Sequence, residues 1–176
     1  QLERQFPWES EDSDTPDIVT SSDSSRNVIM LDFTATWCVN CPNMASAISE
    51  LPDSNINVIP ISVHYADDMA CSASDLLVEE YGISSFPTTI VNFDTNLRTS
   101  TSSVEILKSL AEKSLDDTPK GCDLKIDATL ENGEIQIATT AVLLIDGNYS
   151  IGAALLEDGI VAPQIGSVDN HIHNNV

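Results

Sequence analysis

The chain has 176 residues, of which 41% are hydrophobic, so it is long enough for one medium domain and can bury a core. Asp and Glu total 28 against 7 Lys and Arg, which gives a formal net charge of −21. Nucleic acid and anionic lipid surfaces carry the same sign, so this charge argues against binding to either. No apolar run approaches the roughly 20 residues that span a bilayer, and we expect no transmembrane helix.

Residues 1–26 have the composition of a flexible N-terminal segment. Acidic and turn-forming residues fill positions 9–17 (ESEDSDTPD), and Ser and Asp fill positions 21–25. Such low hydropathy with clustered charge does not support a packed core. The absence of an initiator methionine favours a processed or engineered start.

Residues 27–117 alternate between strand and helix patterns, which predicts an α/β domain with a partly parallel central sheet. Short apolar runs indicate the strands, and apolar residues at helical spacing indicate the helices. The expected strands are Val28–Phe33, Ile56–Val63 and Pro87–Phe93, and the expected helices are Cys41–Leu51, Ala73–Tyr81 and Val104–Leu115. We expect a turn at Asp94–Asn96 after the third strand.

Residues 118–176 predict a small antiparallel β module without helices. Two alternating runs, Leu124–Leu130 and Glu134–Thr140, flank a turn at Glu131–Gly133, which is the pattern of a hairpin. Further strands are expected at Ala141–Ile145, at Tyr149–Leu156 and from Ile160 onward. Sixty residues make a module with exposed edges, so we expect it to pack on the first domain or to be incomplete.

The sequence Trp37-Cys38-Val39-Asn40-Cys41 lies between a buried strand and the start of a helix. Free N–H groups at the helix N-terminus stabilise a thiolate on the first cysteine, and the second can attack a mixed disulfide that the first forms. A zinc site needs four ligands, and Cys71, Cys122 and His64 do not have the spacing of such a site. We therefore predict a redox pair with no metal and no cofactor, with a structural disulfide as the weaker alternative.

Two segments resemble the thioredoxin superfamily. Asp32-Phe-Thr-Ala-Thr-Trp37-Cys38-Val-Asn-Cys41 is similar to that family's strand, tryptophan and redox pair, and Gly82-Ile-Ser-Ser-Phe86-Pro87-Thr88 is similar to its cis-proline segment. The resemblance covers residues 27–117 and implies a thioredoxin-like fold, with a mixed central sheet flanked by helices. It also implies that Cys38 is the attacking thiolate and that Cys41 is the resolving thiol.

The same resemblance assigns roles to four further residues. Asp32 matches a buried carboxylate that takes the proton of the resolving thiol, although a hydrogen-bonded carboxylate at the strand end explains it equally well. Phe86 and Pro87 would form the groove that binds substrate backbone, and Trp37 would cover the disulfide or simply pack. Three features depart from the family pattern: Val39-Asn40 between the cysteines, Pro42 after them, and no lysine in the strand at 57–63.

A narrower resemblance is to the outer membrane protein 28-related family. It rests on Cys38–Asn43, Val63-His64, Phe86–Asn92 and C-terminal matches that include Asn148-Tyr149, Leu155–Val161, Gln164 and His173–Val176. This family consists of exported, often lipid-anchored proteins of Gram-negative bacteria. The resemblance implies an exported lipoprotein in the periplasm or at the cell surface, with a lipid anchor upstream of this segment.

Four other residues leave alternatives open. Cys71 and Cys122 could form a second, structural disulfide between the two modules, or remain separate thiols. His171 and His173 share one face of a strand, where polar strand residues are favoured over a metal pair.

We therefore hold two functional hypotheses. The first is an extracytoplasmic thioredoxin-like thiol–disulfide oxidoreductase whose partners are protein thiols and disulfides. The second is a non-enzymatic surface or interaction protein in which the Cys38–Cys41 disulfide is structural.

Overall fold

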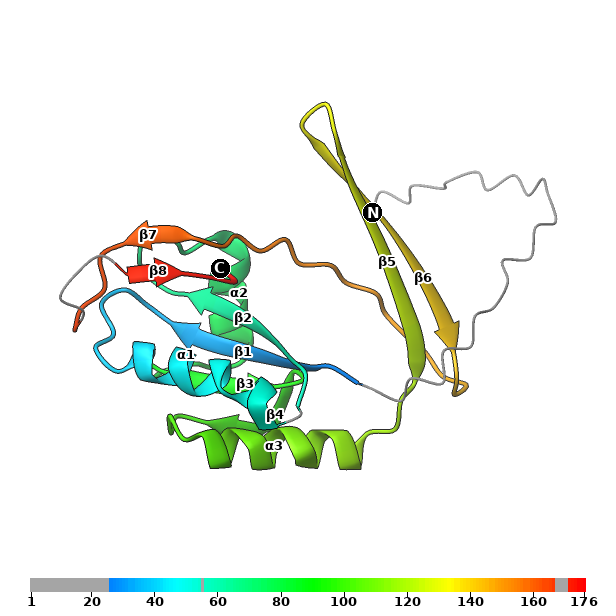
Figure 1. Ribbon diagram of the computed structural model, residues 1–176, viewed down its shortest axis with the longest axis horizontal. Helices are drawn as coiled ribbons and strands as arrows, with labels where there is room; N and C mark the ends of the chain where they lie inside the picture. Colours follow the sequence, from blue (N-terminus) through cyan, green and yellow to red (C-terminus); the bar gives the residue numbers. More distant parts are fainter. Residues whose placement is uncertain (1–25, 55, 167–170) are drawn as a thin grey trace.

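The computed structural model describes residues 26–54, 56–166 and 171–176. The predicted flexible segment, residues 1–26, lies outside this range except for Arg26. The central sheet has four strands in the order β2-β1-β3-β4 (Figure 1). These strands are β1 (Val28–Thr34), β2 (Val58–His64), β3 (Thr88–Val91) and β4 (Asp94–Thr99). β1 pairs in parallel with β2 and antiparallel with β3, so the predicted mixed sheet is confirmed.

Strand β1 is the centre of the fold because its apolar run is buried on both faces of the sheet. Val28 and Met30 belong to one core cluster, and Leu31 and Phe33 belong to another. This division follows from the alternation of side chains along a strand. Asp32 and Thr34 therefore lie on the same face as Met30.

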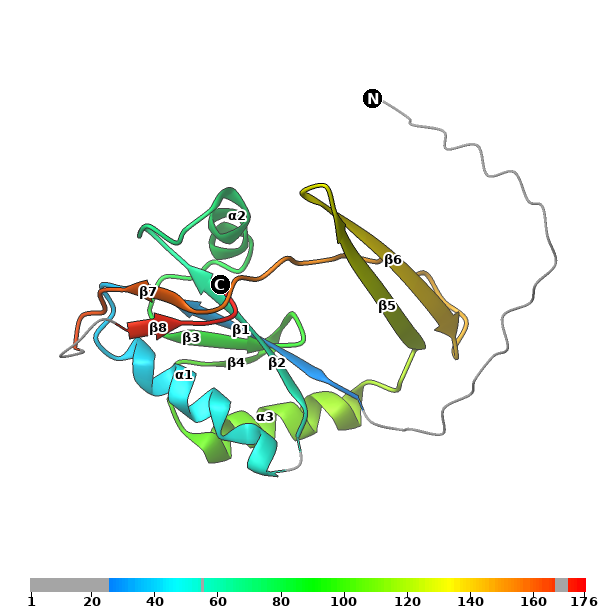
Figure 2. The same ribbon diagram turned by 45° about the horizontal axis from the view of Figure 1, so that its top comes forward.

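Helices cover both faces of the sheet. The helices are α1 (Cys41–Ser49), α2 (Ser72–Glu80) and α3 (Val104–Asp117), and a short 3-10 helix, η1 (Leu51–Ser54), follows α1. α1 and α3 lie on one face, and α2 lies on the other (Figure 2). All three predicted helices are confirmed, but α1 ends at Ser49 because Pro52 starts a tighter turn there.

The turn that was predicted at Asp94–Asn96 is wrong in position. Asn92 and Phe93 both have a positive φ, 47° and 61°, and they form the turn between β3 and β4. A two-residue turn of this kind matches the twist of paired strands. β4 therefore already begins at Asp94.

The predicted antiparallel β structure after residue 118 is confirmed, and it divides into two separate sheets. β5 (Cys122–Glu131) and β6 (Glu134–Leu143) form a long hairpin that projects away from the central sheet (Figure 1). β7 (Ile160–Ala162) and β8 (His171–His173) form a short second pair. The hairpin turn lies at Asn132 and Gly133, which both have positive φ as such a turn requires.

Two of the strands expected in this region do not form. Residues 141–143 belong to β6, since Leu143 pairs with Cys122 at the base of the hairpin. Residues 149–156 form no strand, because among the described residues no neighbouring strand pairs with them. Tyr149 instead donates a hydrogen bond to the carbonyl of Ile145 at 2.7 Å.

After this hairpin the chain returns to the α/β domain (Figures 1 and 2). The backbone N–H of Ser62 in β2 donates to the carbonyl of Asn175 at 2.7 Å, and its hydroxyl donates to the carbonyl of Asn174 at 3.0 Å. The C-terminal segment thus lies along the outer edge of β2. The same segment brings Gln164 and Ile165 next to the loop that follows β1 and carries Cys38.

Candidate active site

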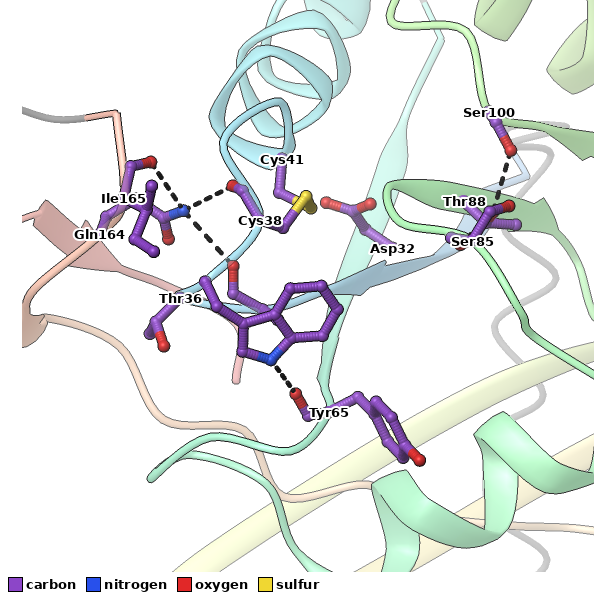
Figure 3. The surroundings of a disulfide bond; sticks show 12 residues. Asp32, Thr36, Cys38, Cys41, Tyr65, Ser85, Thr88, Ser100, Gln164 and Ile165 are labelled. Carbon is purple, nitrogen blue, oxygen red and sulfur yellow. Dashed lines mark hydrogen bonds between the residues drawn. A yellow bond between two sulfur atoms is a disulfide. The ribbon is translucent and has the colours of Figure 1, made fainter.

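The CxxC motif forms a disulfide between Cys38 and Cys41 (Figure 3). Cys41 is the first residue of α1, and both cysteines are buried. The amide N–H of Cys41 donates to the carbonyl of Cys38 at 3.3 Å, which closes the loop between the strand and the helix. A helix N-terminus carries free N–H groups and a positive partial charge, so the pair lies where a thiolate is stabilised.

Asp32 places its carboxylate beside the disulfide, as Figure 3 shows. The residue is 3% exposed, and its nearest described polar partner is Thr89, whose hydroxyl donates to Oδ1 at 3.5 Å. Burial raises the pKa of Asp32 to about 7, although the hydrogen bond from Thr89 acts in the opposite direction. A carboxylate with this pKa can accept and release a proton near neutral pH.

An aromatic cluster lies next to the disulfide. Phe86 packs against the buried cluster of Ala35, Cys38 and Cys41, and the Trp37 ring meets the Phe86 ring edge-on with ring centroids 5.2 Å apart. Tyr65 stacks on the other side of Phe86 at 5.5 Å, and its carbonyl accepts a hydrogen bond from the Trp37 indole N–H at 3.0 Å. The Phe86–Pro87 peptide bond is cis. Trp37 and Tyr65 are exposed, so this cluster offers an aromatic surface beside the redox pair.

Gln164 is a site residue that only the tertiary structure reveals. Its buried side-chain amide donates to the carbonyl of Cys38 at 2.8 Å and to that of Ala35 at 3.3 Å (Figure 3). The next residue, Ile165, donates its backbone N–H to the carbonyl of Thr36 at 2.8 Å. The C-terminal segment therefore holds the loop that carries the disulfide. The sequence signal was limited to the family resemblance, in which Gln164 had no assigned role.

Replacing Gln164 by Ala should lower the free energy of unfolding by about 1–3 kcal/mol, because the two hydrogen bonds from its buried amide are lost and each contributes about 0.5–1.5 kcal/mol. Urea unfolding of the oxidised protein measures this loss. Gln164→Glu is the matched control, since it keeps the size but cannot donate when ionised. We expect it to be at least as destabilising at pH 7, and a Gln164→Ala variant as stable as wild type would contradict the role of the amide.

His64 and Asp67 form a buried pair beside the same loop. His64 Nδ1 and Asp67 Oδ2 are 2.7 Å apart, and the same carboxylate accepts the backbone N–H of Thr36 at 2.8 Å. Burial acts to raise the pKa of Asp67, but hydrogen bonds from His64 and from the Thr36 and Met69 backbone outweigh it and lower the pKa. In the sequence, the position of His64 did not fit a zinc site, and Asp67 had no assigned role.

Asp67→Asn should destabilise the protein at pH 7 by about 1–3 kcal/mol, since a buried histidine loses its ionised partner. Because the folded-state pKa of Asp67 lies below its ordinary value, the stabilisation is present above about pH 4 and is lost as the pH falls further. Unfolding of the wild type and the variant at pH 7 and pH 3 measures the loss of stability and its dependence on pH. An equal loss at the two pH values would contradict this account.

Comparison with known proteins agrees with this geometry. The thioredoxin family model matches residues 13–113, which is more than half of the chain. The chain belongs to the thioredoxin family. No curated protein matches the chain.

Three solved structures are similar to this thioredoxin family member. HBP35 of Porphyromonas gingivalis has 21% sequence identity and a TM-score of 0.63, and the match covers 86% of this chain but 55% of HBP35. This likeness extends the shared fold beyond the thioredoxin domain. A protein of Agrobacterium tumefaciens has 17% identity, covers 62% of this chain and 54% of its own, and has a TM-score of 0.44. A malarial protein has 23% identity, covers 51% of this chain and 99% of its own, and has a TM-score of 0.38.

The other two cysteines of this thioredoxin family member are free, so the second disulfide considered from the sequence is not formed in this structure. Cys71 is exposed at the N-terminus of α2, and Cys122 is half-buried at the start of β5. Backbone hydrogen bonding at Ser74 lowers the pKa of Cys71.

His171 and His173 lie on β8, with ring centroids 4.8 Å apart. In the part of the chain that the structure describes, no group of three His, Cys, Asp or Glu is arranged to hold a metal ion. In the same residues, no helix is long and apolar enough to cross a membrane.

Proposed function

We propose that this thioredoxin family member is a thiol–disulfide oxidoreductase that acts on protein disulfides and dithiols. The observation that carries the proposal is the Cys38–Cys41 disulfide at the N-terminus of α1, beside the buried carboxylate of Asp32. Disulfide exchange needs a stabilised thiolate, a second sulfur and a proton acceptor. The helix N-terminus, the cysteine pair and Asp32 supply these.

In the reducing direction, the Cys38 thiolate attacks one sulfur of a substrate disulfide, and the other substrate sulfur leaves as a thiolate. Cys41 then transfers its proton to Asp32 and attacks Cys38. The bond between Cys38 and the substrate breaks, the second substrate sulfur leaves as a thiolate, and the Cys38–Cys41 disulfide forms. The protein loses two electrons and the substrate gains them. The reverse sequence oxidises a substrate dithiol.

The aromatic cluster supports a peptide substrate. Trp37 and Tyr65 are exposed beside Phe86, which packs against the cluster that contains the two cysteines. Aromatic side chains at a surface bind extended peptides with little loss of side-chain entropy. We assign Phe86 and Pro87 to the groove that positions the substrate next to Cys38, and Trp37 and Tyr65 to its rim.

We place this activity outside the cytoplasm, in the periplasm or at the cell surface, with a lipid anchor upstream. The motif resemblance to the outer membrane protein 28-related family supports this setting, and the net charge of −21 is compatible with it. Fractionation of cells that express the full-length gene tests the proposal. Recovery in the cytoplasmic fraction alone would contradict it.

A second function, that of an interaction protein, is supported by the β5–β6 hairpin. One face of the ribbon carries apolar side chains from both strands. On β5 these are Leu124, Ile126 and Leu130, and on β6 they are Ile135, which pairs with Leu130, and Ile137, which pairs with Ala128. All five side chains are exposed, and apolar faces of this kind often contact other proteins. In this alternative the disulfide is only structural.

The reduction potential of the Cys38–Cys41 pair tests the first function. The protein with Cys71→Ser and Cys122→Ser is equilibrated in graded dithiothreitol or glutathione buffers, and the alkylated thiols are counted. A potential between about −120 and −270 mV, with rapid exchange in the folded state, supports an oxidoreductase. A pair that stays oxidised below roughly −300 mV, or that exchanges only after unfolding, contradicts it and favours the second function.

A further inference from the structure

A cavity of about 220 Å³ reaches the redox pair at Cys41, and its lining does not include the aromatic residues Trp37, Tyr65 and Phe86. It lies between α1, β2 and the C-terminal segment, and its lining includes Asp32, Cys41, His64, His171 and His173. The strand register explains this arrangement: Asp32 pairs with Ser62 and Thr34 pairs with His64, so these side chains share one face of the sheet. The cavity therefore joins the buried carboxylate to a group of histidines.

His173 has an unusual position in this cavity. The residue is 7% exposed, and its Nε2 is buried without a hydrogen-bond partner among the described residues. Leaving a buried polar atom unpaired costs free energy, so such an atom indicates a partner that the protein atoms do not supply. Its ring meets the His64 ring at a centroid distance of 5.3 Å and the His171 ring at 4.8 Å.

The charges around His173 favour a neutral imidazole. Burial lowers its pKa, and the nearby His64 and His171 lower it further, while Asp67 and a backbone hydrogen bond to Ala162 act in the opposite direction. A neutral imidazole with a free ring nitrogen can accept a proton, and the lowered pKa of His173 means that it holds this proton weakly and releases it again. Asp32, Cys41, His64 and His171 are the other titratable residues that line the cavity.

From this geometry we propose that His173 takes up the proton that Asp32 receives from Cys41 and passes it toward solvent. The proposal rests on the proposed oxidoreductase function. His173 is a positioning residue in this scheme, because it acts through Asp32 rather than on the disulfide. His171 is half-buried and its ring contacts the His173 ring, but the proposed route ends at His173, which passes the proton to water.

The step balances as a proton transfer coupled to disulfide formation. The Cys41 thiol loses its proton to the Asp32 carboxylate, and the Cys41 thiolate attacks Cys38 and releases the substrate thiolate. The proton on Asp32 then moves through the cavity to His173 Nε2, which releases it to solvent. Asp32 is thus ionised again before the next exchange. Metal binding is the competing use of three histidines, but the described residues contain no group arranged to hold a metal ion.

The kinetic test uses the protein with Cys71→Ser and Cys122→Ser. The reduced protein reacts with an aromatic disulfide reagent whose released thiolate is coloured. The first equivalent reports the attack by Cys38, and the second reports the attack by Cys41. His173→Asn should slow the second release about tenfold at pH 7 and leave the first unchanged, since only the second needs the proton exit.

Two controls separate proton transfer from a structural role. His171→Asn changes the same residue type in the same strand and should leave the second release within about twofold of the wild-type rate, because the proposed route does not pass through His171. His173→Ala should be slow, and added imidazole should restore its rate. Equal slowing by both Asn variants, or no rescue by imidazole, would overturn the proposal.

A readout that needs no redox activity completes the test. In NMR titrations of the oxidised protein, the His173 ring nitrogens should show a step near the pKa of Asp32, and Asp32→Asn should remove that step. If the coupled titration is present but the wild-type protein exchanges no faster than the Cys38→Ser variant, the oxidoreductase function fails. If exchange is fast but the titrations are independent and His173→Asn is normal, the relay fails.

Discussion

Replacing Cys38 by Ser should reduce thiol–disulfide exchange to the uncatalysed rate, because the attacking thiolate is lost. Replacing Cys41 by Ser should have a different result. Cys38 still attacks, but the mixed disulfide cannot be resolved, so it accumulates and can be isolated with its substrate attached. Exchange with a model disulfide, and mass spectrometry of the products, measure both outcomes.

The reduced wild-type protein is the matched control for stability. The disulfide closes a loop of only a few residues. Its loss should therefore lower the free energy of unfolding by about 2 kcal/mol, both in the two variants and in the reduced protein. A Cys38→Ser variant that exchanges as fast as wild type would contradict the assigned nucleophile. A Cys41→Ser variant that forms no mixed disulfide would favour the interaction-protein function.

Replacing Asp32 by Asn should stabilise the oxidised protein at pH 8 by up to about 4 kcal/mol and should slow the resolving step. Burial raises the folded-state pKa of Asp32 from 3.8 to about 7, so the folded state binds this proton more tightly than the unfolded state. Stability therefore falls as the pH rises from about 4 to about 7. Asn keeps the size and an oxygen for the Thr89 hydroxyl, and it removes the charge.

Chemical unfolding of wild type and variant at pH 4 and pH 8 measures the effect. The two proteins should differ little at pH 4, which is close to the ordinary pKa of 3.8 and well below the folded-state pKa, and most at pH 8. Asp127→Asn is the control, because that side chain is 61% exposed and its replacement should change little at either pH. A stability gain that does not depend on pH would contradict a buried, titrating Asp32.

The elements nearest the redox pair could be predicted because their signals are local. A continuous apolar run predicts a doubly buried strand at β1, and the residues after it place a cysteine pair at a helix N-terminus. The β5–β6 hairpin could be predicted equally well, because runs of alternating apolar and polar residues flank a turn at Asn132 and Gly133. Each of these patterns lies within a few residues of the structure that it predicts.

The turn at Asn92 and Phe93 shows where local reasoning was insufficient. Asp94 and Asn96 are typical turn residues, but the pairing of β4 with β3 drew them into a strand. In the same way, the apolar residues at 149–156 predicted a strand, but a strand needs a neighbour to pair with, and this segment forms none. Tertiary partners, not propensity, decided both segments.

The sequence by itself determined the strand–CxxC–helix motif, because propensity and spacing encode it directly. Its resemblance to the thioredoxin superfamily implied the family and the buried carboxylate of Asp32. The tertiary structure alone decided what surrounds the disulfide. Gln164 binds the carbonyl of Cys38 across 126 residues of chain, and His173 reaches the cavity beside Asp32 only because the C-terminal segment returns to the edge of β2. The pattern of apolar residues along the sequence does not predict such contacts, because they depend on where a distant segment finds hydrogen-bond partners along an open sheet edge.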